Sequence, residues 1–187
     1  MRGPSRPTFL VGVSLLLTFM APARAQQPAG AHVEVPTIAP RPEDVATLDG
    51  ILTAFYDVIS GPAGQPRQWS RDRTLYIPNV RFVSMSTDSA GRIHAEVMDH
   101  QTFVDRSNDG LVRRGFFEQE IHRATQRFGN VVHVFSTYEM RERADGPAFG
   151  RGINSVELFW DGSRWWIASA QWDDERPDNP IPKEYLP

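Results

Sequence analysis

The chain has 187 residues, with 20 Lys and Arg against 23 Asp and Glu, which gives a formal net charge of −3. This acidic balance argues against nucleic acid or an anionic membrane as a partner, because phosphate binding needs a positive surface. The absence of cysteine excludes disulfides, a thiolate metal site and a cysteine nucleophile.

The first 25 residues are typical of a secretory signal peptide. Arg2 and Arg6 make a positive start, residues 9–20 form an apolar core, and Ala23-Arg24-Ala25 has the small-x-small pattern of a cleavage site. The apolar core is shorter than the roughly 20 residues that a membrane-spanning helix needs. We therefore expect an exported protein, periplasmic or extracellular, with no membrane insertion after cleavage.

Residues 26–41 contain several prolines and no sustained period, which predicts a flexible lead or extended arm. A single domain is expected over residues 42–172. Apolar residues recur at three- and four-residue spacings from Pro42 to Ile59, which predicts one long amphipathic helix that ends at Gly61-Pro62.

A second, shorter helix is predicted from Ser70, as its cap, to about Tyr76, with Pro78 as its stop. Residues 80–85 then indicate a short strand and residues 93–98 a possible one. A third short helix is expected after Asp99, which can cap it, and it should end near Asn108-Asp109-Gly110.

Four long runs of β-branched and aromatic residues follow, separated by turn residues, at 116–128, 131–143, 149–160 and 164–172. A proline-rich C-terminal tail, 173–187, is expected to cross the surface irregularly. Helices followed by a meander indicate an α+β fold, with helices packed on one face of a curved antiparallel sheet of four long strands plus a short first strand.

This element order resembles the nuclear transport factor 2-like (SnoaL-like) superfamily over Pro42 to Trp172. The residues that carry the likeness are "AFYDVI" in the first helix, "LYIPNVRF" entering the first strand and "DGSRWW" entering the last. The resemblance implies a cone-shaped fold. It also implies ketosteroid isomerase-like, scytalone dehydratase-like or limonene epoxide hydrolase-like activity, or a non-catalytic ligand-binding or dimerisation module.

The isomerase pattern is poorly matched. Ser84 and Val156 stand where the resemblance would place the catalytic base and the protonated acid, and Tyr56 alone would remain as an oxyanion donor. The looser match is to uncharacterised exported members of the fold, whose resemblance implies no known reaction.

A polar pattern on two neighbouring strands supplies the candidate site. Glu118, Glu120 and His122 alternate and should share one face of a strand. If Gly129-Asn130 is a two-residue hairpin loop, the opposed pairs are Glu118–Arg141, Glu120–Glu139, His122–Thr137 and Gln126–His133. Two opposed carboxylates need a proton, a cation or an imidazolium between them.

Two interpretations of this face stay open. In one it lines the pocket, with Glu120, His122, His133 and Glu139 as catalytic candidates and Tyr56, Asn154, Glu118 and Thr137 as ligand-binding residues. In the other it is the solvated convex side, because the opposite face is the more apolar one, with Phe117, Ile121, Val132, Val134 and Tyr138. Counting by the family pattern favours the pocket, and a one-residue slip would reverse either argument.

The sequence therefore predicts an exported protein that binds an unknown small organic ligand without a cofactor, and simple isomerase- or dehydratase-like acid–base chemistry is one form of that function. A metal site is not expected, because the glutamates and histidines lack a specific ligand motif. The alternative is a non-catalytic homodimeric interaction module, which would use an exposed sheet face bearing Trp160, Trp166 and Trp172.

Overall fold

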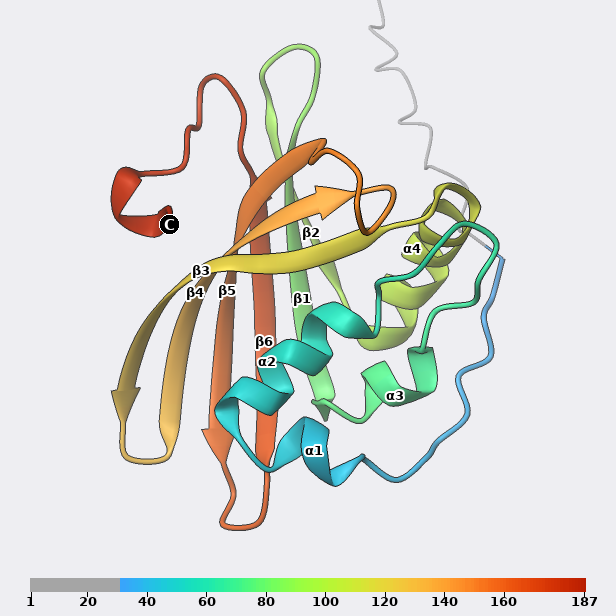
Figure 1. The fold of residues 1–187 in the computed structure, drawn as a ribbon, viewed down its shortest axis with the longest axis vertical. Helices are drawn as coiled ribbons and strands as arrows, with labels where there is room; N and C mark the ends of the chain where they lie inside the picture. The colour runs from blue at the N-terminus through green and yellow to red at the C-terminus, as the bar shows by residue number, and fades with distance from the viewer. Residues whose placement is uncertain (1–30) are drawn as a thin grey trace, which may run out of the picture.

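The predicted first helix is two helices in the computed structural model, which describes residues 31–187. Helix α1 spans Pro42–Val45 and helix α2 spans Leu48–Asp57 (Figure 1). The break occurs at Thr47, whose backbone is extended and whose hydroxyl accepts the N–H of Gly50 to cap α2. The prediction of one continuous helix is therefore wrong, and the predicted signal peptide lies outside the described residues.

The third helix, α3, spans Trp69–Arg73 and is shorter than predicted. Gln68 occupies the cap position that was predicted for Ser70, and Tyr76 belongs to the following strand. The predicted end of this helix at Tyr76 is therefore wrong.

Helix α4 spans His100–Arg114 and is capped by Asp99 as predicted. It continues through Gly110, where an end was predicted, and stops at Gly115, whose φ is 77°. A Cβ at this position would lie 2.6 Å from the carbonyl oxygen of Glu142, so the turn into the next strand requires glycine. Among the described helices, none is both long enough and apolar enough to cross a membrane.

Within residues 31–187, six strands form one sheet in the order β2-β1-β6-β5-β4-β3. The four C-terminal strands are the predicted antiparallel meander, whereas β1 pairs antiparallel with β2 and parallel with β6. The α+β class is confirmed, with a mixed sheet and one more strand than predicted. The strands are β1 (Tyr76–Thr87), β2 (Ile93–Met98), β3 (Phe117–Phe128), β4 (Val131–Arg141), β5 (Gly150–Trp160) and β6 (Trp165–Asp174).

Strand β1 has twelve residues, so the prediction of a short first strand over 80–85 is wrong. Pro78, predicted to stop a helix, lies inside this strand. The pairing with β2 starts only at Phe82, which leaves Pro78 on a stretch with one free side. A proline is tolerated there because no ladder bond requires its missing N–H.

The sheet curves around α2 and α4, so the helices lie in its hollow (Figure 1). The core fills the space between the two layers. Ile51, Leu52 and Phe55 of α2 belong to it, together with residues from the concave face of the sheet: Val132, Val134, Val156, Leu158 and Ile167. Burial of this apolar surface holds the hollow in shape.

Both terminal segments of the described chain pack on the domain. Near the N-terminus, Val35 is buried against Trp69 and Val104. At the C-terminus, the ring of Tyr185 lies 5.4 Å from that of Phe135, on the convex face of the sheet. The tail therefore covers part of the sheet on the side opposite the helices.

Candidate functional site

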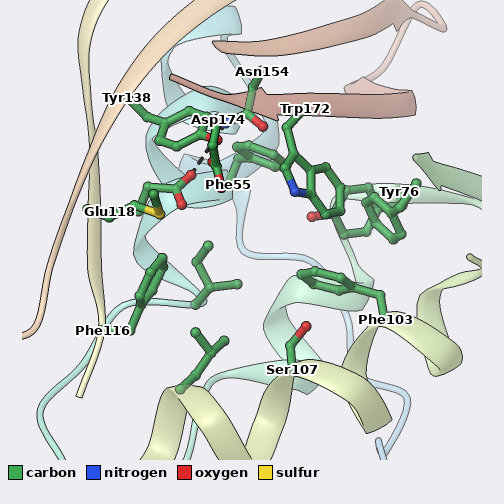
Figure 2. A pocket seen from close by; sticks show the side chains of 14 residues that line it. Phe55, Tyr76, Phe103, Ser107, Phe116, Glu118, Tyr138, Asn154, Trp172 and Asp174 are labelled. Atoms are coloured by element: carbon green, nitrogen blue, oxygen red, sulfur yellow. Dashed lines mark hydrogen bonds between the residues drawn. The ribbon is translucent and has the colours of Figure 1, made fainter. Parts of the chain in front are cut away.

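A cavity of about 200 Å³ lies between the concave face of the sheet and helices α2 and α4. Glu118, Asn154, Asp174 and Ser107 bring polar atoms to it, as Figure 2 shows. An aromatic cavity with a few convergent polar groups is typical of a small-molecule site. Seven aromatic side chains line it: Phe55, Tyr76, Phe82, Phe103, Phe116, Tyr138 and Trp172.

The carboxyl of Glu118 extends from β3 into this cavity (Figure 2). Its Oε1 accepts a hydrogen bond from Nδ2 of Asn154 at 3.3 Å, and none of the ion pairs among residues 31–187 includes it. Burial raises the pKa of Glu118 to about 8, against the opposing effect of the Asn154 hydrogen bond, and the nearby charge of Asp174 raises it further. At neutral pH the carboxyl therefore holds a proton that it can exchange with a bound molecule.

Tyr138 of β4 crosses the cavity wall next to Glu118. Its hydroxyl donates to Oδ1 of Asp174 at 2.5 Å, and burial raises the pKa of this phenol far above its ordinary value. The ring lies so close to Gly152 of β5 that a Cβ there would overlap it. Glycine at this position is thus what lets the ring reach Asp174.

A directional chain of hydrogen bonds runs from the cavity into the protein. Nδ2 of Asn154 lies 3.2 Å from the hydroxyl of Tyr56, which lies 2.6 Å from Oγ of Ser136. Ser136 in turn donates to the carboxylate of Glu120. Since an ionised carboxylate only accepts, Ser136 must accept from Tyr56, and Tyr56 must accept from the Asn154 amide.

Arg123 fixes the far end of this chain. Its guanidinium donates to Oε1 of Glu120 at 2.8 Å and to Asp49 at 2.6 Å. Because Glu120 is paired with Arg123, it acts as a hydrogen-bond acceptor. This fixes the direction of the hydrogen bonds from Ser136, Tyr56 and Asn154. The amide of Asn154 then uses its NH₂ group within the protein, and its Oδ1 has no hydrogen-bond partner among residues 31–187.

Strand β3 contains a β-bulge at Ile121 that the predicted register lacks. His122 lies opposite Thr137 as predicted, but beyond the bulge Glu120 lies opposite Tyr138 and Glu118 opposite Met140. The predicted pairs Glu118–Arg141 and Glu120–Glu139 are therefore wrong. An extra residue in one strand shifts everything beyond it by one position.

The bulge also separates side chains that were predicted to share one face. Glu118 and Glu120 point to the concave side with Tyr138, whereas His122 and Thr137 lie on the convex side. The single polar face is thus wrong, and so is the placement of Thr137 towards the interior. The structure brings together four of the eight predicted site residues, Tyr56, Glu118, Glu120 and Asn154.

The other four candidates lie away from the cavity. Nδ1 of His133 pairs with Glu157 at 2.6 Å on the convex face, and Glu139 pairs with Arg141 at 2.5 Å. The hydroxyl of Thr137 donates to a backbone carbonyl of the C-terminal tail. These contacts, like the position of His122, give none of the four access to the cavity.

The three tryptophans of the predicted interaction face do not share a face. Trp172 lines the cavity, and Trp160 packs on the core with its ring 5.9 Å from that of the buried Trp165. Trp166 alternates with Trp165 and points the other way, where its Nε1 donates to Asp161. The predicted aromatic contact face is wrong, while dimerisation itself stays a prediction.

Sequence reasoning missed several polar groups of the site, among them Ser107, Ser136, Tyr138 and Asp174. Tyr138 was placed on the apolar face, and a tyrosine in such a run is itself a signal, because a buried hydroxyl needs a partner. Asp174 falls within the predicted C-terminal tail, 173–187, whereas in the structure it ends β6. Its contact with Tyr138 depends on the pairing of β5 with β6, which the sequence does not reveal.

A second buried polar cluster lies behind the cavity wall. The fully buried Asp72 accepts from Nε2 of His100 at 2.8 Å and from the hydroxyl of Tyr76 at 2.9 Å. Tyr76 also lines the cavity. This cluster ties α3 to the start of α4; within residues 31–187 no three His, Asp or Glu side chains gather in a way that would hold a metal ion.

No family model matches the sequence, and no curated protein does. Solved structures do match the fold. A protein of unknown function with a cystatin-like fold from Nostoc punctiforme is similar at 7% identity with a TM-score of 0.52, over 70% of this chain and 90% of that one.

Two further structures are similar over most of their length. The beta subunit of a putative aromatic-ring-hydroxylating dioxygenase from Novosphingobium aromaticivorans has 15% identity and a TM-score of 0.52, covering 73% of this chain and 95% of that one. LinA has 6% identity and a TM-score of 0.50, covering 76% and 92%. Identities this low establish the fold alone. With its helices in the hollow of a curved sheet, the chain shares the fold of these solved structures, and the cone-shaped fold that the sequence resemblance implies is confirmed.

Proposed function

We propose that this protein binds a small organic molecule in the cavity and that Glu118 exchanges a proton with it. The observation that carries the proposal is an aromatic cavity of about 200 Å³ whose wall holds a carboxyl with no cationic partner in the described part of the chain. A carboxyl with a pKa near neutrality is suited to general acid–base work, because it can both give and take a proton. The chemistry is cofactor-free in this proposal.

Benzyl alcohol, a small neutral aromatic molecule, is a suitable first probe. In a titration followed by NMR, we expect it to shift the indole N–H of Trp172 and the side-chain amide of Asn154. Both groups line the cavity, whereas Ser155 lies on the opposite face of β5. Shifts confined to the convex face would contradict the proposal.

A cavity-filling variant sharpens this test. Ser107 of α4 points into the cavity (Figure 2), so Ser107→Phe should occupy the space and abolish the shifts caused by benzyl alcohol. Ser89→Phe makes the same chemical change at an exposed turn and should leave them unaltered. Equal binding by both variants would place the probe elsewhere.

We also propose that the protein acts after export, on the basis of its first 25 residues. Expression of the full chain in a bacterial host should yield a periplasmic or secreted protein whose N-terminal residue is Gln26. Mass spectrometry of the purified protein measures this directly, and an intact Met1 in the exported fraction would contradict it.

A further inference from the structure

We propose that the ligand of this cavity is an organic cation, an aromatic or alicyclic amine in its ammonium form. The inference rests on the proposed function and specifies its substrate class. Three features of the lining carry it: aromatic ring faces, two carboxyl groups with no basic side chain beside them in the lining, and side-chain oxygens left as hydrogen-bond acceptors.

The aromatic lining is continuous rather than scattered. The ring of Phe82 lies 5.0 Å from Tyr76 and 4.9 Å from Phe103, and Phe103 lies 5.9 Å from Trp172. A cation over such ring faces is attracted by their negative electrostatic potential, more strongly where water is excluded. This wall therefore favours a positive ligand over a neutral one of the same size.

The ionisable side chains that line the cavity are all acidic. Glu118 and Asp174 line it, and within the described chain no lysine, arginine or histidine does. The nearest basic group of the polar network, Arg123, is held behind the wall by Glu120 and Asp49. A carboxylate or phosphate ligand would enter without any counter-charge, which is costly in a buried site.

Two side-chain oxygens that face the cavity, Oδ1 of Asn154 and the hydroxyl of Tyr138, are left as hydrogen-bond acceptors. In the chain of hydrogen bonds that ends at Glu120, the NH₂ group of Asn154 donates to groups of the protein. The Oδ1 atom of Asn154 therefore remains available to a ligand. The hydroxyl of Tyr138 donates its hydrogen bond to Asp174, and its oxygen lone pairs remain available to accept one from a ligand. An ammonium group, which has donors and no acceptor, complements this set.

Binding of a cation is expected to release the proton of Glu118. The ionisable groups around this carboxyl are Asp174 on β6, Tyr138 on β4, Tyr56 on α2 and Tyr76 on β1, and all of them are acids. The affinity for an ammonium ion should therefore rise with pH as Glu118 ionises, while the affinity for a neutral ligand should not.

Three probes of nearly equal shape separate charge from size: benzylammonium, benzyl alcohol and benzoate. By calorimetry or NMR at about pH 8, we expect benzylammonium to bind roughly tenfold more tightly than benzyl alcohol, and benzoate to bind most weakly. Between about pH 6 and about pH 8, the affinity for benzylammonium should rise by roughly tenfold. Glu118→Gln should remove most of this rise and of the preference for the cation, whereas Glu157→Gln on the convex face should change neither.

The outcomes distinguish the two proposals. If benzyl alcohol or benzoate binds as tightly as benzylammonium, the cation inference is overturned while the cavity remains a binding site. If none of the three probes binds, the proposed function fails and the inference with it. The ranking of probes on the unaltered protein decides the matter even if a variant fails to fold.

Discussion

Glu118 and Glu120 are two positions apart on one strand and have opposite surroundings. Glu120 has Arg123 beside it and accepts from Ser136, so it behaves as a fixed acceptor. Among the described residues, Glu118 has the Asn154 amide and the acidic Asp174 as its polar neighbours, so burial governs its pKa. Two identical residues on one strand face thus take the roles of an orienting group and a proton-exchanging group.

The raised pKa of Glu118 predicts a pH-dependent stability. Its folded pKa of about 8 exceeds the ordinary value of 4.5, so the folded state keeps a proton that the unfolded chain has lost. Between these values the free energy of unfolding should fall as pH rises, by at most about 1.4 kcal/mol per pH unit from this group. Glu118→Gln removes the effect, so urea unfolding should show the variant gaining stability relative to the parent as pH rises through this window. A constant difference between the two proteins would contradict the assignment.

Ser136 is the residue whose loss should disturb the polar chain most. Ser136→Ala would leave the buried hydroxyl of Tyr56 without its acceptor, and Glu120 would keep only its contact with Arg123. We expect a loss of about 1–3 kcal/mol in the free energy of unfolding, measured by denaturant titration. Ser155→Ala, on the other face of the neighbouring strand, is the matched control and should cost far less. If the two variants lose the same free energy of unfolding, the chain of hydrogen bonds does not stabilise the site.

At the scale of elements, the close approach of β4 and β5 shapes the cavity wall. Gly152→Ala would place a methyl group in the ring of Tyr138, which is fixed by Asp174. We expect a loss of about 1–3 kcal/mol and a shift of the Tyr138 ring signals in NMR spectra.

Gly150→Ala on the same strand is a matched control for this change. Its new Cβ would approach only the flexible end of Met140, at 2.7 Å, which can move aside. If Gly152→Ala lost less free energy of unfolding than Gly150→Ala, the close packing of Tyr138 against Gly152 would not be what shapes the cavity wall.

The elements show what the sequence could and could not predict. The four long strands, α4 with its Asp99 cap, and the α+β class follow from periodicity and turn residues. The bulge at Ile121 cannot be predicted from the sequence, because Glu118, Glu120 and His122 alternate in the sequence as they would in a regular strand. The bulge nevertheless decides which of these side chains lie on the concave face. The break at Thr47 was hidden in the same way, since the apolar period continues across it.

At the scale of the whole molecule, the C-terminal tail acts as a cover for the convex face. It places Tyr185 over Phe135 and closes over Thr137, which is fully buried. Removing residues 180–187 should expose this apolar strip and increase self-association, measured by sedimentation velocity. Lys183→Ala, an exposed change within the tail, is the control. The prediction would be contradicted if the truncated protein kept the same oligomeric state as the parent at all concentrations.

The parallel pairing of β1 with β6 determines when the sheet can form during folding. Tyr76 lies opposite Ile167, so the strand that follows the helices finds its partner only near the end of the chain. Contacts this distant in sequence slow folding. During synthesis, the chain emerging from the ribosome therefore lacks the strand that closes its sheet until nearly the whole domain has been made.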